Sequence, residues 1–390
     1  MTMTVLVAPS GFKESLSVTD VTQSISTGIL RAMPDARILQ AAMVDGGEGT
    51  TEGLVRATNG TLVPVQVTGP VGEPVDSFFG ILGGYGPRTA VIEMAAAAGL
   101  SLVPRDQRNP MLTTSYGVGE LIRHALNEGV EKILIGCGDS GINDGGAGLA
   151  QALGARLLDE QGAEIGRGGA ELMWLHRIDL SGLDPRLKTV QIDAAVNWHN
   201  MLLGPKGVAR VFGPQKGATP TQVDYLDAAL QRWATVIRAE TGIDVGQEQG
   251  AGASGGLGAG LLTFAGATLH PRFDIIMQYL DFDRLLAEAD LVVTAEGSLD
   301  GQSPYGKVPC EVARRAEERG IPTIALAGTI GKGVHQTFDH GVSAFASILK
   351  RPCTLEEAIR DGDRLLRRAA EDAMRMMRVG LRLSERQQAA

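Results

Sequence analysis

The sequence predicts an α/β fold, because segments with the pattern of buried strands alternate with amphipathic helical segments along most of the chain. The clearest unit lies in the last third, where a strand at 291–295, a helix at 308–319 and a strand at 323–327 follow one another. This spacing is typical of a βαβ unit and implies parallel strands. A chain of 390 residues exceeds one typical compact core. We therefore expect two α/β domains with parallel sheets of the Rossmann or flavodoxin type.

The other elements follow the same alternation from the N-terminus onward. The run 5–8 has the composition of a buried strand, and a helix begins after Ser17, a residue suited to capping it with Asp20 three residues on. Pro34 marks the end of that helix. We expect the polar, basic segment 378–390 to be a frayed tail. Further strands are expected at 91–94 and 133–135, and further helices at 118–126, 226–237, 257–264 and 355–377.

The two ends of the chain share one pattern, in which a buried strand leads into a polar loop and then a helix. We therefore predict that 1–65 and 285–390 together form one discontinuous domain. The middle of the chain, 66–284, is predicted to form a second α/β domain inserted into the first.

The composition excludes several classes of function. The formal net charge is −9 and no basic cluster precedes the C-terminal tail, which argues against nucleic-acid and anionic-membrane partners. Aromatic residues make up only 4%, so platforms for stacking bases are not expected. The three cysteines form no Cys-x-x-Cys pair, so neither a disulfide framework nor a zinc site is favoured. Because we find no basic leader and no apolar run of about 18 residues, we expect a cytoplasmic protein.

Polar residues gather in loops that directly follow predicted strands. Ligands of open parallel sheets bind at the carboxyl ends of strands, so these loops are candidates for one site. Glycine lets backbone N–H groups approach an anion, while carboxylates can hold a cation. Two acidic, glycine-rich loops lie at 137–148 and 44–50, although both could also be ordinary turns. The candidates on these loops are Lys13, Ser15, Asp45, Glu48, Ser140, Asn143, Asp144, Glu296, Asp300 and Lys307.

Three glycine-rich patterns further suggest anion binding. The segment 301–307 fits Gly-x4-Gly-Lys, but Val308 replaces the hydroxyl residue of a P-loop, so Lys307 is either a phosphate ligand at a helix start or a solvated lysine. The segment 250–260 contains Gly-x-Gly-x-x-Gly without a preceding strand, which suits an anion near Gly252 and Gly255 better than a dinucleotide. Lys216 lies in a glycine-flanked turn and is either a ligand or an exposed lysine.

Taken together and in this order, eight short segments resemble the type-1 glycerate kinase family. The resemblance covers roughly 5–377. One of these segments, 113–115, either caps the helix that follows or lines a pocket. The segments are 8–17 (APSGFKESLS), 44–50 (VDGGEGT), 92–97 (IEMAAA), 113–117 (TTSYG), 143–148 (NDGGAG), 212–218 (FGPQKGA), 250–253 (GAGA) and the group formed by 296–297 (EG), Asp300 and 306–309 (GKVP).

The resemblance implies phosphorylation of D-glycerate by ATP with Mg²⁺, typically at the 2-hydroxyl, in a cleft between two α/β domains. Asp45, Asp144 and Asp300 would hold Mg²⁺ or activate the acceptor hydroxyl. Lys13, Lys216 and Lys307 would neutralise phosphates or the substrate carboxylate, and a homodimer is compatible with this reading. Residues that would orient or bind the substrate and nucleotide are Ser15, Glu48, Ser140, Asn143, Gly252, Gly255 and Glu296.

Five positions depart from the family pattern. Ser10 stands where many members have Asp, and Asp139 replaces a glycine. Asn197 and Met201 replace Asp and Pro, while Ser298 replaces a basic residue. These departures keep open a kinase for another hydroxy acid, phosphorylation of the 3-hydroxyl, or an inactive ligand-binding member of the fold.

Overall fold

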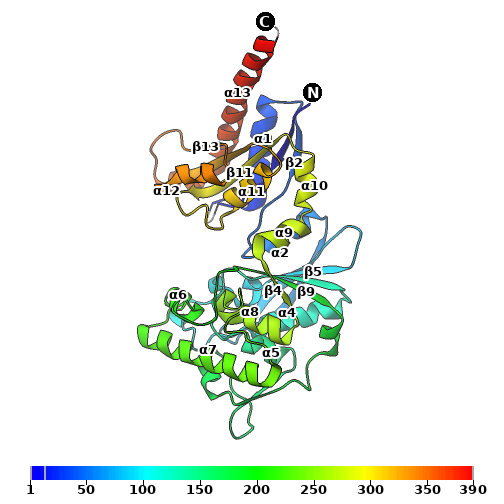
Figure 1. Ribbon diagram of the computed structural model, residues 1–390, viewed down its shortest axis with the longest axis vertical. Helices are drawn as coiled ribbons and strands as arrows, with labels where there is room; N and C mark the ends of the chain where they lie inside the picture. Colours follow the sequence, from blue (N-terminus) through cyan, green and yellow to red (C-terminus); the bar gives the residue numbers. More distant parts are fainter. Residues whose placement is uncertain (1, 13–14, 389–390) are drawn as a thin grey trace. The chain divides into compact units, whose positions relative to one another are not determined.

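The computed structural model describes residues 2–12 and 15–388, which fold into two compact units (Figure 1). The first unit comprises the described parts of Met1–Val44 and Met277–Ala390, and the second comprises Asp45–Ile276. The division falls earlier in the chain than the sequence-based boundaries after 65 and 284. The segment 45–65 belongs to the second unit because helix α2 (Thr50–Ala57) and strand β3 (Thr61–Thr68) pack on that unit's sheet.

The sheet of the first unit is entirely parallel. Its strands lie in the order β13-β12-β11-β1-β2. Counted within the unit, this is the 2-1-3-4-5 order of flavodoxin-like folds, which places the topological switch point between β1 and β11. The strands are β1 (Thr4–Val7), β2 (Arg37–Gln40), β11 (Leu291–Leu299), β12 (Thr323–Ile330) and β13 (Ala344–Ser347).

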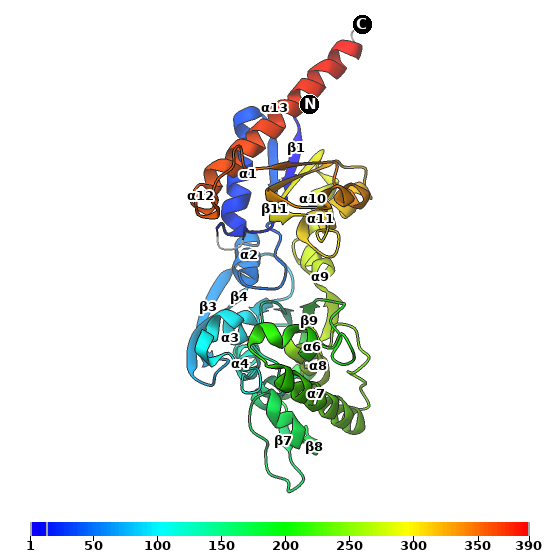
Figure 2. The ribbon, with the colours of Figure 1, turned by 90° about the vertical axis from the view of Figure 1, so that its left-hand side faces the viewer.

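Two long helices of the first unit pack against each other at a glycine. A Cβ atom on Gly28 of α1 (Val18–Ala32) would lie 2.2 Å from the Arg367 carbonyl oxygen of α13 (Gly362–Gln388), so only glycine permits this approach. Figures 1 and 2 both show the two helices side by side. The Ser17 hydroxyl caps α1 by accepting from the Asp20 N–H, as predicted. The remaining helices are α10 (Phe282–Ala287), α11 (Val308–Glu317), η6 (Val334–His340) and α12 (Leu355–Arg360).

The sheet of the second unit is parallel in its first four strands, β10-β9-β6-β5, and antiparallel in the last two, β4 and β3. Its strands lie side by side in the order in which they occur in the chain, so each new strand is added at the same edge of the sheet. The strands are β3, β4 (Pro74–Ile81), β5 (Thr89–Glu93), β6 (Lys132–Gly136), β9 (Gln191–Val196) and β10 (Thr268–Pro271).

Alternation along β4 and β5 assigns the helices of the second unit to the two faces of the sheet. Phe79, Ala90 and Ile92 join the large apolar core with α4 and α8, whereas a Cβ on Gly80 would meet Val55 of α2. Helix α2 therefore covers the opposite face, and Figure 2 shows it across β4 from α3 and α4. The main helices are α3 (Ala95–Ala98), α4 (Tyr116–Asn127), α5 (Ala147–Ala152), α6 (Val208–Phe212), α7 (Pro220–Thr241), α8 (Ala253–Phe264) and α9 (Arg272–Tyr279), which runs across the division between the units.

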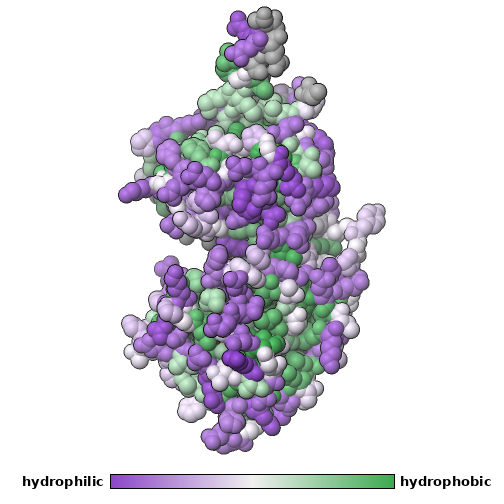
Figure 3. Space-filling model, in the orientation of Figure 1, coloured by the Kyte–Doolittle hydropathy of each residue, from purple (hydrophilic) through white to green (hydrophobic). Residues whose placement is uncertain are grey.

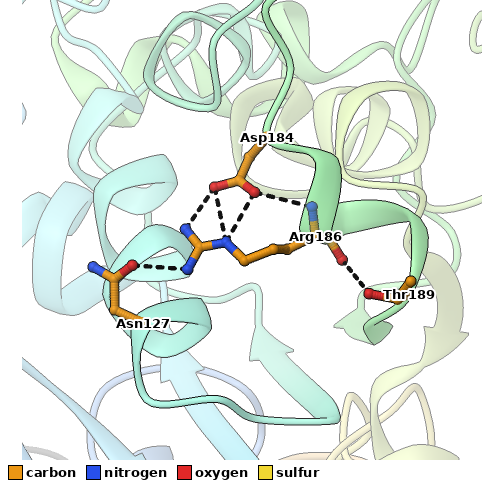
Figure 4. A network of polar contacts seen from close by, with 4 residues as sticks. All are labelled: Asn127, Asp184, Arg186 and Thr189. Atoms are coloured by element: carbon orange, nitrogen blue, oxygen red, sulfur yellow. Dashed lines mark hydrogen bonds and ion pairs between the residues drawn. The ribbon is translucent and has the colours of Figure 1, made fainter.

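Short elements fill the connections of the second unit. Figure 4 shows one such connection, where Arg186 donates to Asp184 and to the Asn127 side chain, 2.8 Å away at the end of α4. The hydrogen bonds from Arg186 lower the pKa of Asp184. The pairing is exposed and so adds little stability, but it fixes the turn that enters β9. The short elements are η1 (Leu100–Leu102), η2 (Arg105–Gln107), β7 (Arg156–Leu158), η3 (Gly169–Trp174), β8 (Arg177–Asp179), η4 (Pro185–Lys188) and η5 (Pro214–Lys216).

The structure corrects three sequence-based expectations about elements. Strand β11 continues through Leu299, so Glu296 lies in a strand beside Ala327 and not in a loop. The last helical segment is split into α12 and α13. Residues up to 388, predicted as a frayed tail, continue α13.

The described residues contain no helix with the length and apolarity needed to cross a membrane. Figure 3 shows hydrophilic and hydrophobic residues interspersed over the face in view.

Candidate functional site

The loop that follows β6 holds a buried lysine. The Nζ atom of Lys216, which arrives from η5, donates to the Ser140 hydroxyl at 2.9 Å and to the Ile142 carbonyl at 2.6 Å. Lys216 is only 2% exposed. The alternative of an exposed turn lysine is therefore wrong. Burial lowers the pKa of Lys216 to about 7, while the charge of Asp144 acts in the opposite direction. The ammonium is therefore costly to keep charged unless an anion joins it.

Asp144 organises the loops around this lysine. Its carboxylate accepts hydrogen bonds from the Ser115 N–H at 2.7 Å, the Ser115 hydroxyl at 2.8 Å, and the N–H groups of Gly146 and Gly148 at 3.2 Å. Burial raises the pKa of Asp144, and these donors partly oppose that shift. The carboxylate thus joins the starts of α4 and α5. With the Thr114 hydroxyl at 3.4 Å, five donors engage the two carboxylate oxygens.

The segment 113–115 lies against the same loop. The Thr113 hydroxyl donates to the Gly141 carbonyl at 3.0 Å, and the Ser115 hydroxyl accepts from the Leu149 N–H while donating to Asp144. Ser115 occupies the N-cap position of α4 without a side-chain cap bond of its own to that helix. Of the two roles considered for the segment, the structure supports lining the site loop.

A left-handed turn completes the surroundings of Lys216. Ser254, Gly255 and Gly256 all have positive φ, at 53°, 72° and 89°, before the regular part of α8 begins. A Cβ on Gly255 would lie 2.0 Å from the Ile142 carbonyl oxygen, the atom that also accepts from Lys216. A non-glycine residue such as Ser254 in this conformation is strained, and such strain concentrates at functional sites. Successive N–H groups in a turn of this kind form an anion-binding concavity.

Asn143 carries an unpaired buried side chain in this cluster. Its side chain is fully buried, yet neither its amide oxygen nor its amide nitrogen has a hydrogen-bond partner among the described residues. Unpaired buried amides are rare because each lost hydrogen bond costs about 1–3 kcal/mol.

The acidic loop at 45–49 packs against the site loop through glycines. A Cβ on Gly138 would lie 2.6 Å from the Gly47 Cα, and a Cβ on Gly47 would lie 2.2 Å from the Asp139 carboxylate and 3.3 Å from the Asp45 carboxylate. Asp139 also accepts from the Glu48 N–H at 3.1 Å. The glycines of these loops thus serve close packing, which brings Asp45 and Asp139 together.

Two side chains of the acidic loop have further partners. Asp45 is 45% exposed at its side chain and lies 3.8 Å from the guanidinium of Arg272. Glu48 accepts from the Ser101 hydroxyl at 2.6 Å. Neither residue is buried as Lys216 is.

Glu93 anchors the acidic loop and was not among the site residues predicted from sequence. It ends β5 on the face covered by α2, is 4% exposed, and accepts from the Thr51 N–H at 2.9 Å in the first turn of that helix. Burial raises its pKa to about 7, against hydrogen bonds from the backbone of Thr51 and Gly49. The sequence did contain a signal for Glu93, since a charged residue ends a strand that is otherwise mostly apolar.

The first unit holds the other predicted residues. Lys307 precedes α11 and its Nζ lies 3.5 Å from the Asp300 carboxylate and 3.4 Å from the Ser298 carbonyl. Ser15 donates to the Ile359 carbonyl at 3.3 Å. Both segments follow strands at the switch point of that sheet, β1 and β11. Lys13 lies outside the described residues.

The structure therefore divides the predicted residues between the units. Within the part of the chain that the structure describes, no three His, Cys, Asp or Glu side chains form a group able to hold a metal. Gly252 lies before the left-handed turn, where a Cβ would be 2.1 Å from the Met201 carbonyl. Those brought together in the second unit are Asp45, Glu48, Ser140, Asn143, Asp144, Lys216, Gly252 and Gly255, and those in the first are Ser15, Glu296, Asp300 and Lys307.

Comparison with known proteins shows the family of this chain. The profile described as the Glycerate kinase family matches residues 5–378. The chain belongs to the glycerate kinase family. Glycerate kinase of Halalkalibacterium halodurans is 46% identical, with 95% of this chain and 97% of the relative covered. Glycerate 2-kinase of Escherichia coli K12 is 44% identical, with 97% and 99% covered. The chain is also similar to a crystal structure from Salmonella typhimurium LT2 whose title gives the name glycerate kinase 2. The two have a TM-score of 0.86 and 46% identity, with 98% of this chain and 100% of that one covered.

This glycerate kinase family member carries its departures at structurally distinct places. Asp139 has a φ of 50°, a left-handed conformation that explains why a glycine commonly stands there. Ser298 lies inside β11 beside Thr329. The carbonyl of Met201 contacts Gly252, so the altered 197–201 segment lies next to the left-handed turn.

Proposed function

We propose that this enzyme transfers the γ-phosphoryl group of ATP to the 2-hydroxyl of D-glycerate, with Mg²⁺. The observation that carries the proposal is the buried Lys216, held by Ser140 and Ile142 beside the left-handed turn at 254–256. Phosphoryl transfer depends mainly on positioning and on neutralising charge, which such a cation and N–H groups provide.

Each residue of the second unit takes a role that fits its contacts. Lys216 would neutralise a phosphate or the substrate carboxylate, and Ser140 would hold its ammonium in place. Asn143 would bind substrate or nucleotide through its unpaired amide. Gly252 and Gly255 would let the turn approach the phosphates. Asp144 would position these loops.

The acidic loops offer the kind of ligands that Mg²⁺ usually has in proteins. Mg²⁺ prefers oxygen ligands, and near phosphates it is typically held by one or two carboxylates with water completing its shell. Asp45 and Asp139, which converge over Gly47, would supply such carboxylates. When bound, the ion would neutralise charge on the phosphates. Asp144 is already engaged by backbone donors, so we do not include it among the ligands.

The residues of the first unit remain part of the proposal because of their types and their positions after strands. Lys307 precedes a helix, where a phosphate is favoured by free N–H groups and the helix dipole. Asp300 would bind nucleotide or metal, and Ser15, Glu296 and Lys13 would bind or orient substrates.

The direct test is ADP release from MgATP with D-glycerate, followed by phosphorus NMR of the product. We expect 2-phosphoglycerate. A 3-phosphoglycerate product would contradict the assigned hydroxyl, and release of ADP with other hydroxy acids alone would contradict the assigned acceptor. A lack of turnover with any acceptor in a panel would refute the kinase proposal.

A further inference from the structure

Arg108 is a cation whose backbone packs against the turn that carries Lys216. Its Nε atom is buried and has no hydrogen-bond partner among the described residues, and within that part of the chain its guanidinium forms no ion pair. A guanidinium stays charged at every physiological pH, so burying one of its N–H groups without an acceptor costs free energy. Such a cost is recovered when an anion binds.

The backbone places Arg108 against the turn that carries Lys216. A Cβ on Gly217 would lie 2.2 Å from the Arg108 carbonyl oxygen and 2.9 Å from the Arg108 Cβ, so the two chains touch. Gly217 has a φ of 98° and directly follows Lys216. The two cations therefore stand on adjoining backbone segments.

The segment after Arg108 is tied to helix α7 and to the site loop. The Asn109 side chain accepts from Gln222 in the first turn of α7 at 3.3 Å and from the Met111 N–H at 3.2 Å. Farther along, the Thr113 hydroxyl donates to Gly141, next to the Ile142 carbonyl that holds Lys216. Arg108 is thus on a fixed segment, which favours a binding role over a mobile surface charge.

We propose that Arg108 binds the carboxylate of the hydroxy-acid acceptor. The planar guanidinium offers parallel N–H groups that match a carboxylate in a bidentate pair, whereas the N–H groups of the 254–256 turn suit a phosphate. This assignment rests on the proposed function and makes Arg108 the residue that distinguishes an acid from a simple alcohol.

The test compares R108M and R108K with R105M, a matched control at an exposed arginine in the same loop. The KM for D-glycerate is measured at saturating MgATP, and the KM for ATP at saturating D-glycerate. We expect R108M to raise the KM for D-glycerate about 10- to 100-fold, the range for a charged hydrogen-bonded pair, with the KM for ATP within about twofold. R108K should recover part of the loss, and R105M should match the wild type.

Binding of D-glycerate, measured by calorimetry, gives a second readout that needs no turnover. We expect R108M to bind D-glycerate at least about tenfold more weakly than the wild type, and thermal unfolding checks that the variant is folded. An unchanged KM and affinity for D-glycerate would overturn the proposal. A rise in the KM for ATP alone would also overturn it and would assign Arg108 to phosphate. A wild type that turns over no glycerate would instead refute the proposed function.

Discussion

Replacing Lys216 by methionine should change how the stability of the second unit depends on pH. Methionine keeps much of the length of the lysine and removes the charge that burial disfavours. Lys216 is 2% exposed and its pKa is lowered to about 7, from the model-compound value of 10.5. The unfolded chain therefore binds this proton more tightly than the folded one.

The sign and the size of the effect follow from proton linkage. Between pH 7 and 10.5 the unfolded state carries more protons at this residue, so its contribution to stability rises with pH. The unfavourable contribution is fully present below pH 7. One pH unit across this window corresponds to about 1.4 kcal/mol, so the wild type should gain about 2 kcal/mol between pH 7 and 9 from Lys216 alone.

The assay is urea unfolding at pH 7 and pH 9, followed by tryptophan fluorescence. All three tryptophans, Trp174, Trp198 and Trp233, lie in the second unit, so the signal reports that unit. The wild type and K216M are compared with K206M, a control at an exposed lysine. The wild-type advantage over K216M should increase by about 2 kcal/mol from pH 7 to pH 9, and that over K206M should not change.

A difference between wild type and K216M that stays constant across this pH range would refute the reasoning. It would mean that the folded protein does not disfavour the charged lysine. The same variant should lose phosphoryl transfer by at least about 100-fold, the scale on which a positioned charge stabilises a transition state. If K216M keeps full activity, Lys216 is structural.

Three further predictions concern the residues around the lysine. The wild type should lose about 3 kcal/mol of unfolding free energy between pH 4.5 and 7, because the raised pKa keeps Glu93 protonated in the folded state while the unfolded state ionises. E93Q should abolish this loss, and urea titration of both proteins at the two pH values checks it. D144N should lower unfolding free energy by about 3 kcal/mol, since an amide nitrogen would face N–H donors, and an unchanged melting temperature would contradict that role. G138A should reduce kcat more than melting temperature, because its Cβ would push Gly47 and the adjacent acidic residues away, and G380A, with open space around it, is the control.

The strands, most helices and their parallel pairing could be predicted because they depend on local patterns. Apolar runs such as 5–8 and 133–135 fixed the strands, and Ser17 with Asp20 fixed the start of α1. The division between the units was misplaced because α2 and β3 gain their places by packing on a distant sheet. Likewise, β11 extends through Glu296 because pairing with β12 outweighs the polar residues in its second half.

The candidate site was predicted as a set of residue types, but their separate roles required the structure. Asp144 has the chemistry of a metal ligand, and only the contacts reveal five backbone and hydroxyl donors around it. From sequence alone, Lys216 could be a ligand or an exposed surface lysine, and only its burial in the structure decides between the two. Glu93 and Arg108 were missed because their importance lies in burial and in the presence or absence of partners, neither of which a single sequence contains.

The polar groups of the second unit favour an anionic ligand over a purely structural role. A structural cluster would pair its charges internally, as Asp144 does with its donors. Lys216 has only neutral acceptors on its ammonium, Asn143 has an unpaired buried amide, and Arg108 has a buried N–H without an acceptor. Each costs stability on its own, and an anion that accepted from any of these N–H groups would lower that cost. Such a substrate would therefore stabilise the second unit when it binds. D-glycerate should raise the melting temperature of the wild type and not that of R108M, which would show that these unpaired groups bind the substrate.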